Sequence, residues 1–270
     1  MPLEPCALTI GGLDPSGGAG VFADLRAFAA ASVWGCGAVA VVTVQSTAGL
    51  RSSHPIDTKK LLDQVREIAL HQHVRAVKIG ALGSASNARA IARWLGTLDE
   101  SIPIVLDPVL EPSRSSSRAR LLEPGAIPIL LAMMKRVTLI TPNVPEAETL
   151  LRTRIRSLSQ AEQAARELVA LGARAALVKG GHLPARASRD KTTDVLAIDR
   201  RVVHLEAPRV DVAFHGTGCT LSSLVAARLA RRQMIDDDAI VAAVRWAKRK
   251  LQLALARPLR IGDGLSVLDP

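Results

Sequence analysis

The alternation of short apolar runs with helix-length segments constrains the fold of this sequence more than any other feature. Apolar runs of strand length lie at residues 7–10, 38–44, 74–80, 102–107, 137–140 and 175–181. Helical patterns lie at residues 57–72, 86–98, 127–134, 159–172, 219–229 and 238–255, and residues 194–205 predict a hairpin that turns at 199–201. Strands joined through helices pair in parallel and need helices on both faces. We therefore expect a three-layer α/β/α fold with a mostly parallel sheet, in one domain spanning residues 1–270.

Composition and charge exclude several classes of protein. Hydrophobic residues make up 48% of the chain, enough for a core, but no apolar run reaches the roughly 18 residues of a membrane span. The net charge of +10 could indicate nucleic-acid binding. However, the basic residues are scattered, and three tryptophans, three phenylalanines and no tyrosine are too few for a base-stacking surface. Three cysteines without a CxxC pair, and no signal-peptide pattern, are typical of a cytoplasmic protein. From the scattered charge, the few aromatic residues and the short apolar runs, we expect neither a nucleic-acid nor a membrane partner.

Polar and glycine-rich segments follow the predicted strands in turn. They read GGLDPSGGAG, QST, GALGS, DPVL, TPNVPEAE and KGGH. The carboxyl ends of parallel strands lie at one edge of a sheet, where α/β proteins bind their ligands. Six such segments at one edge predict a small-molecule site there. The sequence contains neither a GxGxxG dinucleotide fingerprint nor a GxxxxGK[ST] phosphate loop, which excludes those two nucleotide-binding designs.

Cys219 lies where a glycine-flanked turn becomes a helix. Gly216 and Gly218 leave the first backbone N–H groups of that helix accessible, and such groups bind anions. A cysteine at this position has a lowered pKa and lies beside the anion, which would make it reactive. The alternative interpretation is a buried cysteine at an ordinary helix start, and these residues alone do not decide between the two.

Two carboxylates and a lysine at strand ends fit phosphoryl transfer. Asp107 and Glu146 are suited to holding a hydrated Mg²⁺, whereas Glu148 is less suited and could face solvent. Lys179 follows an apolar strand and precedes two glycines, which favours contact with phosphate over an ordinary surface position. A magnesium site, a lysine and a helix N-terminus together position and neutralise a transferring phosphoryl group. These residues therefore predict a kinase.

Seven segments resemble, in the same order, the hydroxymethylpyrimidine/phosphomethylpyrimidine kinases of thiamine biosynthesis, which belong to the ribokinase-like superfamily. They are LTIGGLDPSGGAGVFADLRAF, VQST, VKIGALGS, VLDPV, ITPNVPEAE, LVKGGH and HGTGCTLSS, spread over almost the whole chain. The DPSGGAG and HGTGC blocks together are specific to these kinases. The resemblance implies a ribokinase-like fold and ATP- and Mg²⁺-dependent phosphorylation of 4-amino-5-hydroxymethyl-2-methylpyrimidine, then of its monophosphate. We also expect a homo-oligomer.

The resemblance also implies roles for individual residues. Gln45 would read the aminopyrimidine, since a carboxamide both donates and accepts hydrogen bonds. Asn143 and Glu146 would organise Mg²⁺ and the nucleotide phosphates. Cys219 would activate the acceptor, at the position where most sugar kinases of the superfamily have an aspartate. Further implied substrate-pocket residues are Gly12, Ala19, Asp24, Ala81 and Val109, and the implied phosphate-binding residues are Lys179, Gly216, Thr217 and Gly218.

Three departures from the family pattern bear on the acceptor. Ala81 stands where these kinases usually have methionine, which removes a flexible wall from the pocket, and Leu110 replaces another common methionine. The segment 111–120 is longer than the usual flap and lacks its glycine, and Arg114, Arg118 or Arg120 could supply charge there. Two alternatives therefore stay open. One is a pyridoxal or pyridoxine kinase, and the other is a non-catalytic ligand-binding domain on the same fold.

Overall fold

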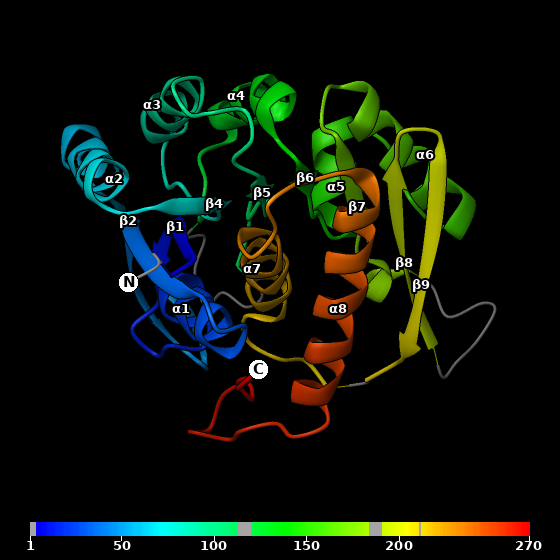
Figure 1. The fold of residues 1–270 in the computed structure, drawn as a ribbon. Helices are drawn as coiled ribbons and strands as arrows, with labels where there is room; N and C mark the ends of the chain where they lie inside the picture. The colour runs from blue at the N-terminus through cyan, green and yellow to red at the C-terminus, as the bar shows by residue number, and fades with distance from the viewer. Residues whose placement is uncertain (1–3, 113–119, 184–190, 211) are drawn as a thin grey trace.

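One twisted sheet forms the middle of the molecule. The computed structural model describes residues 4–112, 120–183, 191–210 and 212–270. Within these ranges nine strands pair in the order β3-β2-β1-β4-β5-β6-β7-β8-β9 (Figure 1). The six strands from β2 to β7 in this order are parallel, and β3, β8 and β9 are each antiparallel to a neighbour, which confirms the mostly parallel sheet. The strands are β1 (Cys6–Leu13), β2 (Trp34–Ser46), β3 (Gly49–Pro55), β4 (Val74–Ile79), β5 (Ile104–Leu106), β6 (Leu139–Ile140), β7 (Ala175–Val178), β8 (Lys191–Ile198) and β9 (Arg201–Pro208).

Helices cover both faces of this sheet and bury a separate apolar cluster on each (Figure 1). One face carries α1 (Gly20–Ala30), α7 (Thr217–Ala230) and α8 (Asp237–Leu255). The other face carries α2 (Thr58–His71), α3 (Ala85–Leu95), α4 (Ile127–Met133), α5 (Val144–Leu151) and α6 (Leu158–Ala170). Short 3₁₀ turns lie at Pro124–Ala126, Met134–Arg136 and Gly180–His182. The three-layer α/β/α arrangement is therefore confirmed.

Helix α7 is buried on all sides, although its apolar spacing predicts only one buried face. Every residue from 220 to 227 is buried, because alanine and serine on its other faces let α1 and α8 approach closely. The helix also packs on β4 and β5. This packing holds the N-terminus of α7 in a fixed place at the carboxyl edge of the sheet.

Three elements differ from the sequence expectation. Helix α1 begins directly after the glycine-rich loop, and β3 is a polar edge strand without the apolar alternation that would predict it. Helix α5 begins inside the segment interpreted as a loop. It forms because Asn143 caps it: Asn143 Oδ1 accepts from the Glu146 N–H at 2.9 Å, and Glu146 Oε2 accepts from the Asn143 N–H at 2.7 Å.

The sheet ends in the β8–β9 hairpin, whose turn begins at Asp199 with a φ of 48°. Ion pairs connect β9 to β8 and to α6. Glu206 pairs with Lys191 on β8, and His204 lies 2.9 Å from Glu162 on α6. Figure 1 shows this hairpin at the end of the sheet that is remote from β2.

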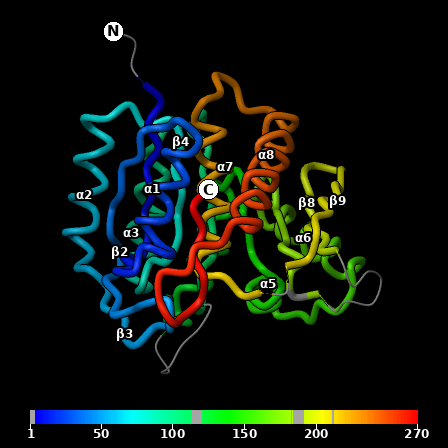
Figure 2. Tube along the Cα trace, turned by 90° about the horizontal axis from the view of Figure 1, so that it is seen from below, coloured from blue at the N-terminus to red at the C-terminus, as the bar shows by residue number. Residues whose placement is uncertain are grey.

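The last residues of the chain return to the carboxyl edge of the sheet. The His215 N–H donates to the carbonyl of Ser266, and the Leu265 N–H donates to the carbonyl of Thr47, each at 2.9 Å. Figure 2 shows this C-terminal segment along the carboxyl edge of the sheet. The segment therefore connects the loop after β2 with the turn before α7.

Candidate active site

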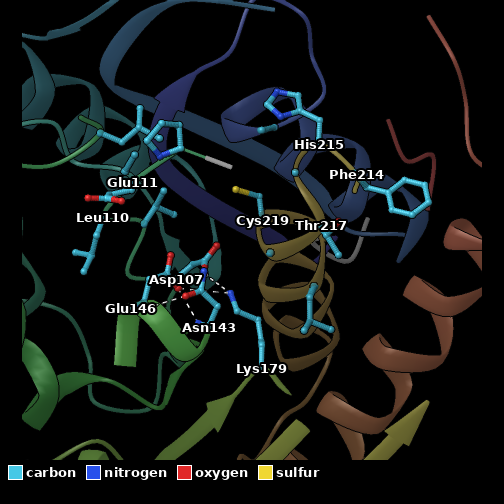
Figure 3. A pocket seen from close by; sticks show the side chains of 18 of the residues that line it. Asp107, Leu110, Glu111, Asn143, Glu146, Lys179, Phe214, His215, Thr217 and Cys219 are labelled. Carbon is cyan, nitrogen blue, oxygen red and sulfur yellow. Dashed lines mark hydrogen bonds and ion pairs between the residues drawn. The ribbon is translucent and has the colours of Figure 1, made fainter. Parts of the chain in front are cut away.

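A cavity of about 860 Å³ opens at the carboxyl ends of the parallel strands. The loops after the parallel strands line it together with the N-terminus of α7 and part of α8. The residues predicted from the sequence that line it are Gly12, Ala19, Gln45, Ala81, Asp107, Val109, Asn143, Glu146, Lys179, Gly216, Thr217, Gly218 and Cys219. Of the predicted site residues only Asp24 is absent from the lining. Figure 3 shows Cys219 between His215 and the group formed by Asp107, Glu146 and Lys179.

Asp24 lies beneath the cavity floor, fully buried, and it contacts the cavity through Lys78. Lys78 Nζ donates to Asp24 Oδ1 and Oδ2 at 3.1 and 2.9 Å. Thr9 Oγ1 and Ser223 Oγ donate to the same carboxylate at 2.6 and 2.7 Å. Burial opposes the charge on Lys78, but the carboxylates of Asp24 and Asp107 outweigh it, so the pKa of Lys78 is raised. Lys78 is thus a permanent cation that lines the cavity.

The N-terminus of α7 presents backbone donors to the cavity. No side chain caps the helix, so the first-turn N–H groups are available to a ligand. Gly216 has a φ of +78°, and a Cβ at this position would overlap the carbonyl of Gly18. Only glycine fits there. Thr217 and Gly218 follow in the first turn and line the cavity, so their N–H groups are accessible to the anion that the sequence predicts.

The pKa of Cys219 is opposite to the sequence expectation. Burial of the thiol, together with the nearby charges of Asp24 and Asp107, raises its pKa to about 11. Lys78 and a hydrogen bond from the Gly20 N–H act in the other direction but are weaker together. The expectation of a lowered pKa was wrong because the helix N-terminus is one of several groups around the sulfur, and the carboxylates and the buried surroundings outweigh it. The thiol is therefore protonated at neutral pH.

Asp107, Glu146 and Lys179 form one charged group in the cavity, on the side of Cys219 away from His215 (Figure 3). Lys179 Nζ donates to Asp107 Oδ1 at 3.0 Å and lies 4.0 Å from Glu146 Oε2. Burial and the charge of Asp107 raise the pKa of Glu146 to about 7, against the opposing effects of Lys179 and the Asn143 N–H. Burial opposes the charge on Lys179, but both carboxylates outweigh it and raise its pKa.

The donor set at this end fits a cation that brings other ligands with it. Among the described residues no group of three histidine, cysteine or acidic side chains is placed to hold a metal alone. Asp107 and Glu146 are two carboxylates that share one lysine. Mg²⁺ in kinases is commonly held by one or two carboxylates, with waters and substrate phosphates completing its shell. The residues therefore fit Mg²⁺ that arrives with a nucleotide.

Sequence reasoning missed several polar residues that line the cavity. Lys248 on α8 donates to Asp194 Oδ2 at 2.6 Å, and Asp194 Oδ1 accepts from the Gly180 N–H at 2.9 Å. The sequence does contain a signal for two lysines. Lys78 lies among apolar residues of β4, and Lys248 lies on the apolar, buried face of α8. Asp14 and His215 also line the cavity, and their two positions give no sign in the sequence that they meet.

Apolar residues form the wall of the cavity around Ala81 and Val109, which is called the acceptor end below. Ala81 packs in a small cluster with Val41, Leu50 and Leu121, and Val109 packs against it. Leu110 is buried beside the cavity. Arg114 and Arg118 lie outside the described residues. Arg120 is exposed and lines the cavity, and its carbonyl accepts from Ser53 Oγ at 2.7 Å.

Comparison with known proteins finds relatives along almost the whole chain. The chain is 36% identical to the hydroxymethylpyrimidine/phosphomethylpyrimidine kinase of Haemophilus influenzae, covering 95% of this chain and 93% of that one. It also matches the thiamine biosynthesis multifunctional protein of Corynebacterium efficiens at 35% identity, of which it spans 35% of the length.

Solved structures show the same fold. An ADP complex of Bacillus subtilis pyridoxal kinase has a TM-score of 0.85 at 27% identity, covering 99% of this chain and 97% of that chain. The Clostridium difficile phosphomethylpyrimidine kinase has a TM-score of 0.75 at 28% identity, covering 92% and 100%. The family model described as phosphomethylpyrimidine kinase matches residues 14–269. This chain therefore belongs to the phosphomethylpyrimidine kinase family.

Proposed function

We propose that the protein transfers the γ-phosphoryl group of ATP to 4-amino-5-hydroxymethyl-2-methylpyrimidine and then to the resulting monophosphate. The observation that carries the proposal is a single cavity with two different ends. One end has Lys179, two carboxylates and the uncapped N-terminus of α7, which suit nucleotide phosphates. The other has Gln45 against a small apolar wall that includes Ala81, which suits a flat polar ring.

In this reaction the oxygen of the acceptor hydroxymethyl group bonds to the γ-phosphorus as the bond to ADP breaks. The hydroxyl proton passes to Cys219 Sγ, which must first be a thiolate. Since the pKa of this thiol is about 11, the thiolate is a minor form at neutral pH, and Lys78 and the Gly20 N–H stabilise it. The first-turn N–H groups of Gly218 and its neighbours donate to the transferring phosphoryl oxygens.

Asn143, Glu146 and Asp107 would hold Mg²⁺ together with phosphate oxygens. When bound, the ion would neutralise charge on the nucleotide phosphates. Asn143 helps by fixing Glu146, since the two residues exchange the hydrogen bonds of the capping box. Lys179 supplies the remaining positive charge at this end.

Removal of divalent cations should abolish turnover. Where Asp107, Glu146 and Lys179 meet, two carboxylates share one lysine, so this part of the cavity has no net positive charge to neutralise the phosphates of a nucleoside triphosphate. We expect no product in excess EDTA and full recovery when Mg²⁺ is restored. Undiminished turnover in the chelator would contradict the metal assignment.

The substitution Gln45→Ala should weaken acceptor binding more than ATP binding. Loss of paired amide contacts to a polar ring costs roughly 1–3 kcal/mol, which corresponds to a 5- to 150-fold rise in acceptor KM. We expect the KM for ATP to stay within about twofold. Gln163→Ala, at an exposed glutamine of α6, is the matched control. Equal effects on both ligands would place Gln45 outside the acceptor subsite.

The choice of acceptor is decided by one assay. The purified protein is given ATP and either the free pyrimidine, its monophosphate, or pyridoxal, and all phosphorylated products are resolved. We expect both pyrimidine products to form with the higher kcat/KM. Pyridoxal is the second candidate because Ala81 enlarges the pocket and the pyridoxal kinase of Bacillus subtilis has the same fold. A higher kcat/KM for pyridoxal would replace the proposal with that activity.

The remaining expectations about partners and location stay predictions. No helix in the described parts of the chain has the length and apolar character to cross a membrane. The predicted homo-oligomer is tested by sedimentation of the purified protein. The predicted cytoplasmic location and the absence of nucleic-acid binding rest on the sequence composition.

A further inference from the structure

His215 and Asp14 form a buried pair beside the acceptor end of the cavity. The two residues are 5% and 2% exposed, and His215 Nε2 lies 2.7 Å from Asp14 Oδ2. Asp14 also accepts from the N–H groups of Ser16 and Ala19, each at 2.9 Å. Ser16 Oγ donates to the carboxylate as well, so each of its partners other than His215 is a donor. Burial opposes its charge, but His215 and Ser16 outweigh it and lower the pKa of Asp14, so the group is ionised and can only accept.

The proton between these two residues must therefore be on His215 Nε2. The position of this proton determines which atom of the Gln45 carboxamide can face the histidine. One terminal atom of the Gln45 carboxamide, Nε2, lies 3.3 Å from His215 Nε2. An amide nitrogen and a protonated ring nitrogen are both donors, so they cannot form a hydrogen bond with each other.

The other end of the amide gives the same result independently. Gln45 Oε1 lies 3.2 Å from Thr43 Oγ1, and Thr43 Oγ1 lies 2.8 Å from the carbonyl oxygen of Leu13. The hydroxyl has one proton, and the carbonyl at the shorter distance can only accept. Thr43 Oγ1 is therefore free to accept, and its partner on the amide should be a nitrogen. A half-turn of the amide, which exchanges atoms of nearly equal size, gives Thr43 Oγ1 a donor. It also turns the amide oxygen toward the single Nε2 proton of His215, which the oxygen shares with Asp14 as the longer branch of a three-centre hydrogen bond.

We propose that His215, held by Asp14, is a positioning residue for the acceptor: it turns the Gln45 amide oxygen toward itself and the amide nitrogen toward Thr43. The inference rests on the proposed function, in which the Gln45 carboxamide forms hydrogen bonds with the acceptor ring. In this orientation Gln45 offers the ring an acceptor on the His215 side and a donor on the Thr43 side. An aminopyrimidine matches it, with its amine toward His215 and its adjacent ring nitrogen toward Thr43.

The matching probe is the 4-oxo analogue of the hydroxymethylpyrimidine. It has nearly the same shape, but a carbonyl replaces the amine and an N–H replaces the ring nitrogen, so its hydrogen-bond pattern is reversed. A fixed amide rejects it because buried polar groups would be left unpaired. An amide that can turn freely would accept either ring. The ratio of kcat/KM values for the amino and oxo rings therefore measures how firmly Gln45 is oriented.

We expect the wild-type protein to prefer the amino ring by more than tenfold, and His215→Leu to lower that preference at least tenfold. His215→Gln keeps a donor for Asp14 and Gln45 and should retain most of the preference. His204→Leu makes the same substitution at an exposed histidine of β9 and should leave the ratio unchanged. In the double variant Gln45→Ala with His215→Leu, the ratio should equal that of Gln45→Ala alone, because His215 acts through Gln45.

A second measurement needs no variant. Long-range ¹H–¹⁵N NMR of the wild-type protein should show a proton on His215 Nε2, and a neutral ring protonated only at Nδ1 would overturn the inference. An unchanged amino/oxo ratio in a folded His215→Leu protein would also overturn it, while the proposed kinase function would stand. Failure of the wild-type protein to phosphorylate the aminopyrimidine would instead refute the proposed function.

Discussion

Cys219→Ala should lower kcat by about 10²–10⁴-fold while the protein remains folded and binds both substrates. This is the usual effect of removing a general base. Cys219→Ser should also be slow, because a hydroxyl is a much weaker base of similar size. Cys36→Ala is the matched control, since Cys36 is also partly buried but lies on β2, beside Cys6, outside the cavity lining. The measurement is kcat for the three variants alongside thermal melts.

The pH dependence of turnover distinguishes a base from a packing role. Because the thiol pKa is about 11 and only the thiolate accepts a proton, the reactive fraction rises tenfold per pH unit below that value. The ratio of wild-type kcat to Cys219→Ala kcat should therefore increase with pH between 7 and 9. A ratio that stays flat, or an alanine variant within a few-fold of wild type, would assign catalysis to the backbone cradle and lysines instead.

Asp24→Ala should lower the free energy of unfolding by about 3–5 kcal/mol, the cost of leaving a buried cation without its partner. Lys78 is 1% exposed, and Asp24 is the carboxylate that it contacts at hydrogen-bond distance. Thr9 and Ser223 would lose their acceptor as well. Chemical denaturation of the two proteins gives the difference directly.

Two further variants test the cause of this loss. Asp24→Ala combined with Lys78→Met removes the stranded charge and should recover a substantial part of the stability. Asp63→Ala breaks an exposed i,i+4 pair with Lys59 and should cost no more than about 0.5 kcal/mol. A loss of less than 1 kcal/mol for Asp24→Ala would mean that water reaches Lys78 and that the pair is not buried in solution.

The sequence predicts the architecture because its signals are local. Each apolar run between helices specifies a strand within a few residues, and the parallel order follows from the crossovers. Elements stabilised by single contacts were less predictable. Helix α5 depends on the hydrogen bonds exchanged by Asn143 and Glu146, and β3 is recognisable as a strand only through its pairing with β2.

The sequence predicts which residues form the site better than it predicts which of them contact one another. Motifs locate most of the residues that line the cavity. However, Asp14 meets His215 across 201 positions of sequence, and Lys78 meets Asp24 across 54. The pKa of Cys219 depends on such distant neighbours, so its position at a helix start alone predicts the wrong direction of the shift.

The β8–β9 hairpin also has a consequence for solubility. An unpaired sheet edge recruits strands from other chains and promotes aggregation. On β9 the exposed charges of Arg201 and Glu206, together with a closing Pro208, oppose such recruitment. The next strand in the sheet, paired with β8, is β7, whose four residues, AALV, are all apolar and buried. Substitutions that detach the hairpin would therefore expose an aggregation-prone edge at β7, and lower the yield of soluble protein before they alter the distant acceptor end of the cavity.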